Sequence, residues 1–149
     1  MKVTPLHEVI IGLKRVRKES TIVEKLQRND SFALRTLLQG NFDPRVKFNF
    51  PVGEPPFEKK NEEVELTRPL LMKLGACMAN AKGNNTTKER IFIDFLEAIN
   101  RRDATLFVLM KDKALSSKYP FLTEDIVRKA FPKLLLDNDS QTVDDSQGQ

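Results

Sequence analysis

The sequence of 149 residues lacks tryptophan and contains only one cysteine and one histidine. A single cysteine cannot form a disulfide within its own chain, and a free thiol is typical of a reducing compartment. No apolar run approaches the roughly 20 residues that span a bilayer, and the first residues lack the apolar stretch of a secretory signal. These absences predict a cytoplasmic protein that does not associate with a membrane.

The same scarcity limits the chemistry that the chain can support. A Ser–His–Asp or Cys–His arrangement would need His7, which no catalytic motif surrounds. Cys77 lies on the apolar stripe of an expected helix, which favours a buried and unreactive thiol. One histidine and one cysteine do not supply the usual ligands of a zinc site. We therefore expect no enzymatic activity, no metal and no cofactor.

Two further groups of polar residues contain the residue types of a functional site, but not in the arrangement that such a site requires. The segment from Gly83 to Lys88 offers a glycine, hydroxyls and a lysine, but not the second glycine and the Gly-Lys-Ser/Thr order of a phosphate-binding loop. A turn and a helix cap are expected there, with anion binding at the helix start as the alternative. The carboxylates of Glu62, Glu63 and Glu65 belong to a charged run, which predicts solvated side chains rather than acid–base catalysis.

Apolar residues recur at helical spacing along most of the chain. Hydrophobic residues make up 40% and charged residues 31% of the sequence, a balance typical of globular domains. The clearest helical stripe consists of Ile91, Phe92, Phe95, Leu96 and Ile99. The sequence therefore predicts an all-α fold, a single compact bundle of about six or seven short helices over residues 1–136.

Capping residues predict where these helices begin and end. The first helix is expected over residues 5–18, the third should end at Gly40 in the left-handed conformation, and the seventh should end before Pro132. The caps expected at helix starts are Thr4, Thr21 with Glu24, Asp30 or Ser31, Thr67, Thr86 with Glu89, Asp103 and Thr123.

A segment rich in proline and phenylalanine interrupts the helical pattern over about residues 41–65. Val46, Phe48 and Phe50 alternate with polar residues, which predicts one short extended segment before the prolines exclude regular structure. Exposed aromatic residues and prolines suit protein recognition, and the alternative is that the phenylalanines pin the loop to the helices. The candidate protein-binding residues are Phe42, Phe48, Phe50, Pro55, Pro56 and Phe57.

The formal charge of +4 conceals an asymmetry along the chain. All 25 Lys and Arg precede residue 137, whereas four of the 21 Asp and Glu lie in residues 137–149, so residues 1–136 carry +8. Residues 137–149 are expected to form an acidic disordered tail, either as a solvating end or as a screen for a polyanion-binding surface. Cations also favour helix C-termini for electrostatic reasons alone. The candidate polyanion-binding residues are Lys14, Arg15, Arg17, Lys18, Lys88, Arg90, Arg101, Arg102, Arg128 and Lys129.

Six short segments together carry a family resemblance, namely Asp30–Leu38, Gly40–Pro44 with Lys47-Phe48, Pro51–Pro56, Lys111–Lys113, Tyr119–Thr123 and Lys129–Pro132. In this order the chain resembles a family of small uncharacterised proteins of contractile-tailed bacteriophages of the T-even type, including those of cyanobacteria. The resemblance runs over roughly residues 6–136 and is weakest across 58–85. It implies a phage origin and a host-cytoplasmic setting, and it supplies no catalytic residue.

The function that these features favour is non-enzymatic. We expect a bacteriophage accessory protein, an adaptor or modulator that binds a phage or host protein in the infected host cytoplasm. The alternatives are a nucleic-acid-binding protein that uses the basic body, or a minor component of the virion.

Overall fold

Helices account for every regular element of the computed structural model between residues 4 and 135, the part of the chain that it describes. The all-α prediction is confirmed, whereas the acidic tail predicted at 137–149 lies outside the described residues. The elements are α1 (Leu6–Ile11), α2 (Glu19–Arg28), α3 (Phe32–Phe42), α4 (Arg68–Met72), the 3-10 helix η1 (Lys73–Cys77), α5 (Asn85–Ala98), α6 (Arg101–Lys111), α7 (Leu115–Lys118) and α8 (Glu124–Ala130).

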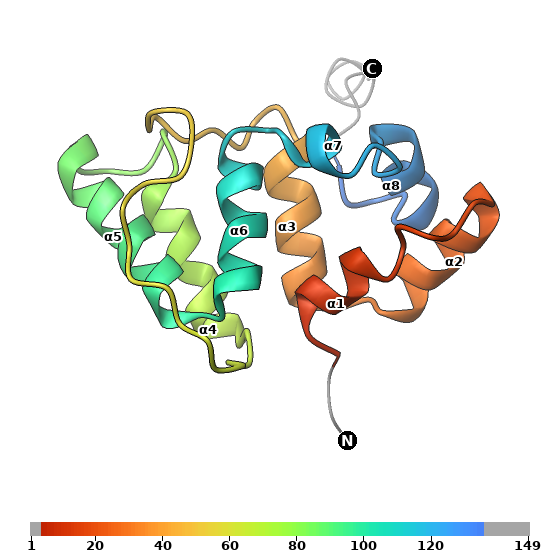
Figure 1. Ribbon diagram of the computed structural model, residues 1–149. Coiled ribbons are helices and arrows are strands. Elements are labelled where there is room, and N and C mark those ends of the chain that lie inside the picture. The colour runs from red at the N-terminus through yellow and green to blue at the C-terminus, as the bar shows by residue number, and fades with distance from the viewer. Residues whose placement is uncertain (1–3, 136–149) are drawn as a thin grey trace, which may run out of the picture.

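The helices lie on both sides of a central pair, α3 and α6, which pack side by side (Figure 1). On one side of this pair, α5 packs against η1, and η1 follows directly on α4. On the other side, α2 packs against α8, and α1 contacts α6. None of the helices in the described part of the chain has the length and apolar character needed to span a bilayer.

The core contains the side chains that helical spacing predicts. Phe92, Phe95, Leu96 and Ile99 of the strongest predicted stripe are each at most 1% exposed. Phe95 of α5 meets Phe107 of α6 edge to face, with ring centroids 5.1 Å apart, a favourable arrangement of two aromatic rings. These contacts fix α5 against the central pair.

Three of the predicted caps are confirmed. Ser31 accepts the Leu34 N–H at 3.0 Å, Thr67 accepts the Leu70 N–H, and Thr123 accepts the Ile126 N–H. Each of these side-chain oxygens satisfies an amide that has no partner within its own helix.

Other predicted boundaries are wrong, because a residue nearer the true helix start provides the cap. Asn84 caps α5 in place of Thr86, and Asn100 caps α6 in place of Asp103. The second helix begins at Glu19, before the Thr21 capping box. Helix α7 has only four residues and was not predicted from the pattern, because so short a segment shows no period.

The first helix is much shorter than the predicted range 5–18. Helix α1 ends at Ile11 and continues in tight turns, in which Leu13 N–H bonds Ile10 O and Lys14 N–H bonds Ile11 O. Leu13 remains 1% exposed, so its apolar contact is kept without a helix. The basic residues at positions 14–18 therefore follow a turn and do not form the last turn of a helix.

Gly40 does not end α3, which continues to Phe42. Its role is close packing, because a Cβ atom at this position would lie 2.3 Å from Sδ of Met110 on α6. Real Cβ contacts are essentially never so short, so the missing side chain leaves room for the Met110 side chain to pack against α3.

Candidate functional site

The candidate site is the loop of residues 43–67, which joins α3 to α4 and contains no helix. The predicted alternation is present at its start, since Val46, Phe48 and Phe50 are half-buried and Lys47 and Asn49 are exposed. No strand forms among these residues, and the loop has one isolated bridge, between residues 60 and 100. Figure 1 shows the loop running along the outside of α5 and α6.

The start of the loop is held by charged side chains. The Asp43 carboxylate is fully buried and its Oδ2 lies 3.0 Å from Nη2 of Arg45. Burial alone would raise the pKa of Asp43, but the hydrogen bonds from Arg45 outweigh it and hold that pKa below its ordinary value. The ammonium of Lys113 donates to the carbonyls of Gly40 and Asp43, both at 2.8 Å.

The turn of the loop is held by the end of α6 and the residue that follows it. The Lys111 ammonium donates to Pro51 O at 2.8 Å and lies 2.6 Å from Oδ1 of Asp112. Oδ2 of Asp112 accepts the Gly53 N–H at 2.9 Å. Only 2% of the Lys111 side chain is exposed, and a buried charge is tolerated when it is paired in this way.

The second half of the loop is held along α5 and the start of α6. Oε2 of Glu97 accepts the Glu58 N–H at 2.9 Å, and Lys60 O accepts the Arg101 N–H at 2.8 Å. Nδ2 of Asn100 donates to the carbonyls of residues 61 and 62, both at 3.0 Å. Ordered contacts therefore occur along the whole loop.

The phenylalanines of the loop face inward. Phe50 stacks on Phe92 of α5 with ring centroids 5.5 Å apart, and Phe48 lies 6.2 Å from each of these two rings. Phe57 of the loop and Phe42, the last residue of α3, are half-buried as well, and Nζ of Lys59 lies 4.8 Å from the Phe57 ring centroid. These contacts therefore agree with the alternative interpretation, in which the phenylalanines hold the loop against the helices.

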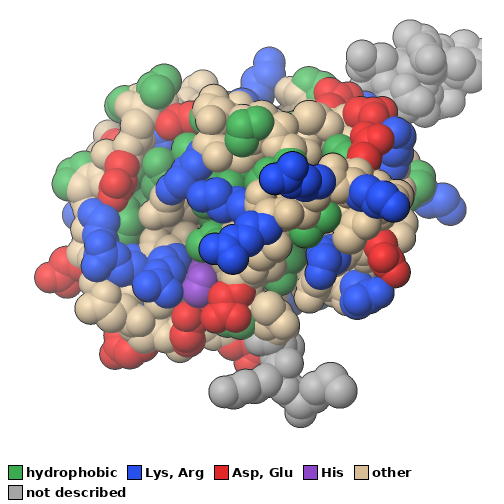
Figure 2. Space-filling view, turned by 45° about the vertical axis from the view of Figure 1, so that its right-hand side comes forward, with side chains coloured by type: hydrophobic (Ala, Val, Ile, Leu, Met, Phe, Trp, Pro, Cys, Tyr) green, Lys and Arg blue, Asp and Glu red, His purple; other side chains and the backbone are tan. Residues whose placement is uncertain are grey.

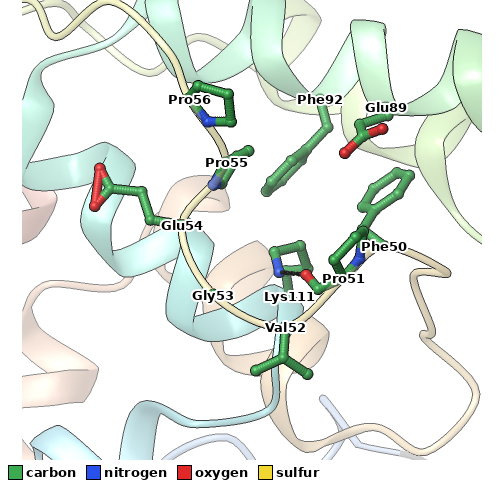
Figure 3. Close-up of a pocket in the computed structure, with 10 residues that line it drawn as sticks. All are labelled: Phe50, Pro51, Val52, Gly53, Glu54, Pro55, Pro56, Glu89, Phe92 and Lys111. Atoms are coloured by element: carbon green, nitrogen blue, oxygen red, sulfur yellow. Dashed lines mark hydrogen bonds between the residues drawn. The ribbon is translucent and has the colours of Figure 1, made fainter.

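The turn itself faces solvent. Val52 is 88% exposed and points away from the rings in Figure 3. The neighbouring Gly53 has a φ of +102°, which an L side chain rarely adopts. Beneath the turn is a hollow of about 180 Å³, whose lining residues are Phe50, Pro51, Val52, Gly53, Glu54, Pro55, Pro56, Glu89, Phe92 and Lys111. The sequence did not identify Val52 as a candidate binding residue, because a single valine between proline and glycine forms no recognisable pattern.

The candidate polyanion-binding residues separate into three groups, one buried, one ion-paired and one exposed. Lys88 is wrongly included, since it is 4% exposed and its Nζ donates to Ala79 O at 3.1 Å. Lys129 is paired with Glu19 and Asp125, and Arg128 with Glu124. The remaining candidates are exposed, namely Lys14, Arg15, Arg17, Lys18, Arg90, Arg101 and Arg102. Figure 2 shows Lys and Arg side chains spread over the face around the single histidine, with acidic side chains next to the histidine and at several places along the rim.

The single histidine lies in a polar cluster between α1 and α6. His7 is 2% exposed, its backbone N–H donates to Oδ1 of Asp103 at 2.9 Å, and its Nε2 lies 2.9 Å from Oε2 of Glu63. Asp103 thus caps α1, whose own N-cap is Pro5, instead of capping α6 as predicted. Burial is the main cause that raises the pKa of the Asp103 carboxyl above its ordinary value, and the charges of Glu63 and Glu8 add to it.

A groove of about 850 Å³ lies beside this cluster. Its walls come from the start of the chain, the α2–α3 junction and the end of the 43–67 loop, and Asp103 and Glu63 are among its lining residues. The sequence did not predict this groove, because residues far apart in the chain form it.

The single cysteine has the environment predicted for it. Cys77 is fully buried, and its Sγ lies 3.6 Å from Lys73 O. Burial raises the pKa of the Cys77 thiol to about 11, so the nucleophilic thiolate is scarce at neutral pH.

Comparison with known proteins gives one match. A family model described as a family of unknown function, DUF6433, matches residues 11–117, which include the whole 43–67 loop. No curated protein and no solved structure matched the chain.

Proposed function

The chain belongs to the DUF6433 family, whose function is unknown, and we propose that it acts by binding another protein through the exposed turn of the 43–67 loop. The observation that carries this proposal is the contrast between the turn and its supports. Val52 is 88% exposed, yet the backbone on either side of it is hydrogen-bonded to Lys111 and Asp112.

Such an arrangement reduces the loss of conformational entropy on binding. A mobile loop loses conformational entropy when a partner orders it, whereas this turn is already ordered in the free protein. A valine flanked by Pro51 and Gly53 also supplies apolar surface that a partner can desolvate. Phe48, Phe50 and Phe57 of the loop act as supports for the turn, and the contacts themselves come from the residues around Val52.

The setting of this activity forms part of the same proposal. The six segments that resemble proteins of contractile-tailed bacteriophages support a phage accessory protein that acts in the cytoplasm of an infected host. The buried thiol of Cys77 and the structural pairing of His7 support a non-enzymatic role. The partner is then a phage or a host protein.

Replacing Val52 with aspartate is expected to abolish partner capture without a loss of stability. The side chain is 88% exposed, so the change should alter the free energy of unfolding by no more than about 0.5 kcal/mol. Affinity purification of tagged protein from infected cells, with and without nuclease, measures capture, and thermal unfolding measures stability. Met72→Asp is the matched control, because Met72 is an apolar residue of α4 that is 62% exposed.

Full capture of the same partners by Val52→Asp would contradict this proposal. The two supporting rings provide a second check. If Phe50→Ala and Phe57→Ala both lower thermal stability sharply while every partner is retained, the loop is structural and does not bind a partner.

A second candidate function, nucleic-acid binding, is favoured by the basic residues between α1 and α2. Lys14, Arg15, Arg17 and Lys18 are exposed, and within residues 4–135 none of their side chains has a hydrogen-bond or ion-pair partner. Attraction to a helix C-terminus does not explain them, because α1 ends at Ile11 with no basic residue in its last turn.

Electrophoretic mobility shift with DNA and RNA at rising salt tests this second function. Binding through these residues should weaken steeply with salt, by about 0.9 in log K per log unit of salt for each phosphate contact on duplex DNA. Changing Lys14, Arg15, Arg17 and Lys18 to Gln should flatten that slope, whereas changing the exposed Lys73 and Lys82 should not. No shift at low salt would exclude the function.

A further inference from the structure

Three side chains with metal-ligand chemistry converge at the start of α1. Among residues 4–135, the ligand atoms of His7, Glu8 and Glu63 lie within 4.8 Å of one another. Two of these residues are neighbours on α1, and the third comes from the 43–67 loop. The sequence did not predict this group, because Glu63 belongs to a run of carboxylates that resembles a solvated charge cluster.

The spacing of the histidine and the loop carboxylate suits a shared metal ion. Nε2 of His7 lies 2.9 Å and 3.3 Å from the two carboxylate oxygens of Glu63. Two ligand atoms that each lie about 2.0–2.1 Å from a tetrahedral zinc are roughly 3.3 Å apart. An ion could therefore replace the hydrogen bond between these side chains with little movement of either one.

A buried carboxylate behind the group provides a second, independent observation. Asp103 is 1% exposed and faces the groove that Glu63 also lines. Its Oδ1 accepts the His7 N–H, while its Oδ2 has no donor among the described residues. Within residues 4–135, none of Asp103, Glu8 and Glu63 forms an ion pair with a lysine or an arginine. Three carboxylates thus lie at this point without an ion pair to a lysine or an arginine of the described residues, although the chain as a whole carries +4.

We propose that His7, Glu8 and Glu63 bind a divalent transition-metal ion, with Asp103 behind them supplying additional negative charge. Imidazole and carboxylate ligands together suit zinc better than magnesium or calcium, which prefer oxygen ligands alone. Three protein ligands leave a fourth tetrahedral position for water or another ligand. The ion joins α1 to the end of the 43–67 loop, so it stabilises the folded chain.

Calorimetric titration with Zn²⁺ tests the site. The wild-type protein is expected to bind one ion per chain, and the Glu63→Gln variant should bind it more than about tenfold more weakly, since even the loss of an outer partner of a metal ligand costs about that much. Glu63 is half-exposed and its amide analogue can still bond His7, so this variant should fold. Glu62→Gln, one residue away and exposed, is the matched control and should bind as the wild type does.

Three outcomes would overturn the site. They are the absence of Zn²⁺ binding to the wild type, equal affinity in Glu63→Gln and Glu62→Gln, and a Co²⁺ spectrum with the charge-transfer band of a thiolate ligand, which would place the ion at Cys77. A rise in the unfolding temperature with Zn²⁺, lost in Glu63→Gln and kept in Glu62→Gln, would support the site by a second measurement.

Discussion

Replacing Phe92 with alanine is expected to lower the free energy of unfolding by about 3–5 kcal/mol and to release the 43–67 loop from α5. Phe92 is 1% exposed, so its removal leaves a cavity in the core. It is also the ring on which Phe50 stacks and against which Phe48 packs at a tilt, and without it these two loop side chains lose their ring contact with the helix.

Phe95→Ala separates the loss of core packing from the release of the loop. Phe95 lies on the same helix and is equally buried, but the ring that it meets is Phe107 on α6. The two variants should lose similar free energies of unfolding in urea. Native-state hydrogen exchange at the Gly53 and Glu58 amides, which bond side chains of Asp112 and Glu97, should accelerate in Phe92→Ala only.

Equal exchange in the two variants would show that the rings do not hold the loop. If exchange accelerates as expected, partner capture by Phe92→Ala becomes informative as well. A mobile turn must be ordered again on binding, so capture should weaken even though Val52 is unchanged.

Replacing Asn100 with alanine is expected to cost about 2–4 kcal/mol of the free energy of unfolding. This side chain is 3% exposed and makes three hydrogen bonds. Its Oδ1 accepts the Arg102 N–H at 2.8 Å and caps α6, while its Nδ2 donates to the carbonyls of Asn61 and Glu62. Alanine leaves all three backbone groups without this partner.

Asn100→Asp tests the two roles of this residue separately. Aspartate keeps the shape and the capping oxygen, but it has no N–H to donate and places a charge against two carbonyl oxygens. We therefore expect most of the loss seen with alanine to persist, with faster exchange in the second half of the loop. A stability equal to that of the wild type would mean that the amide donors do not hold the loop. Urea denaturation measures all three proteins.

Helical spacing in the sequence identified most of the helices, because a buried stripe must repeat every three to four residues. The stripe that begins at Ile91 lies on α5 as far as Leu96, and Ile99 is the C-cap residue of this helix. The precise starts were harder to predict, since Thr86 and Asn84 are both good caps and the path of the chain selects between them. The end of α1 was also hard to predict, because tight turns after Ile11 keep Leu13 in the core just as a longer helix would.

Helical spacing does not predict the role of a residue whose contact partner lies far away in the sequence. Gly40 has the sequence context of a helix end, and the neighbouring Met110 on α6 makes it a contact point between helices. Asp103 has the sequence context of a cap for its own helix, and it caps α1 instead, 96 residues earlier in the chain. In both cases the partner is set by packing between helices.

By itself, the sequence determined the all-α class, the buried unreactive cysteine and the interruption of the helices by a proline-rich loop. Each of these follows from local composition and period, which neighbouring residues along the chain provide. The tertiary structure alone decided that the loop phenylalanines face inward, that Val52 faces solvent, and that His7, Glu8 and Glu63 meet. These features depend on which helix surfaces pack together, and the spacing of residues along one segment does not contain that information.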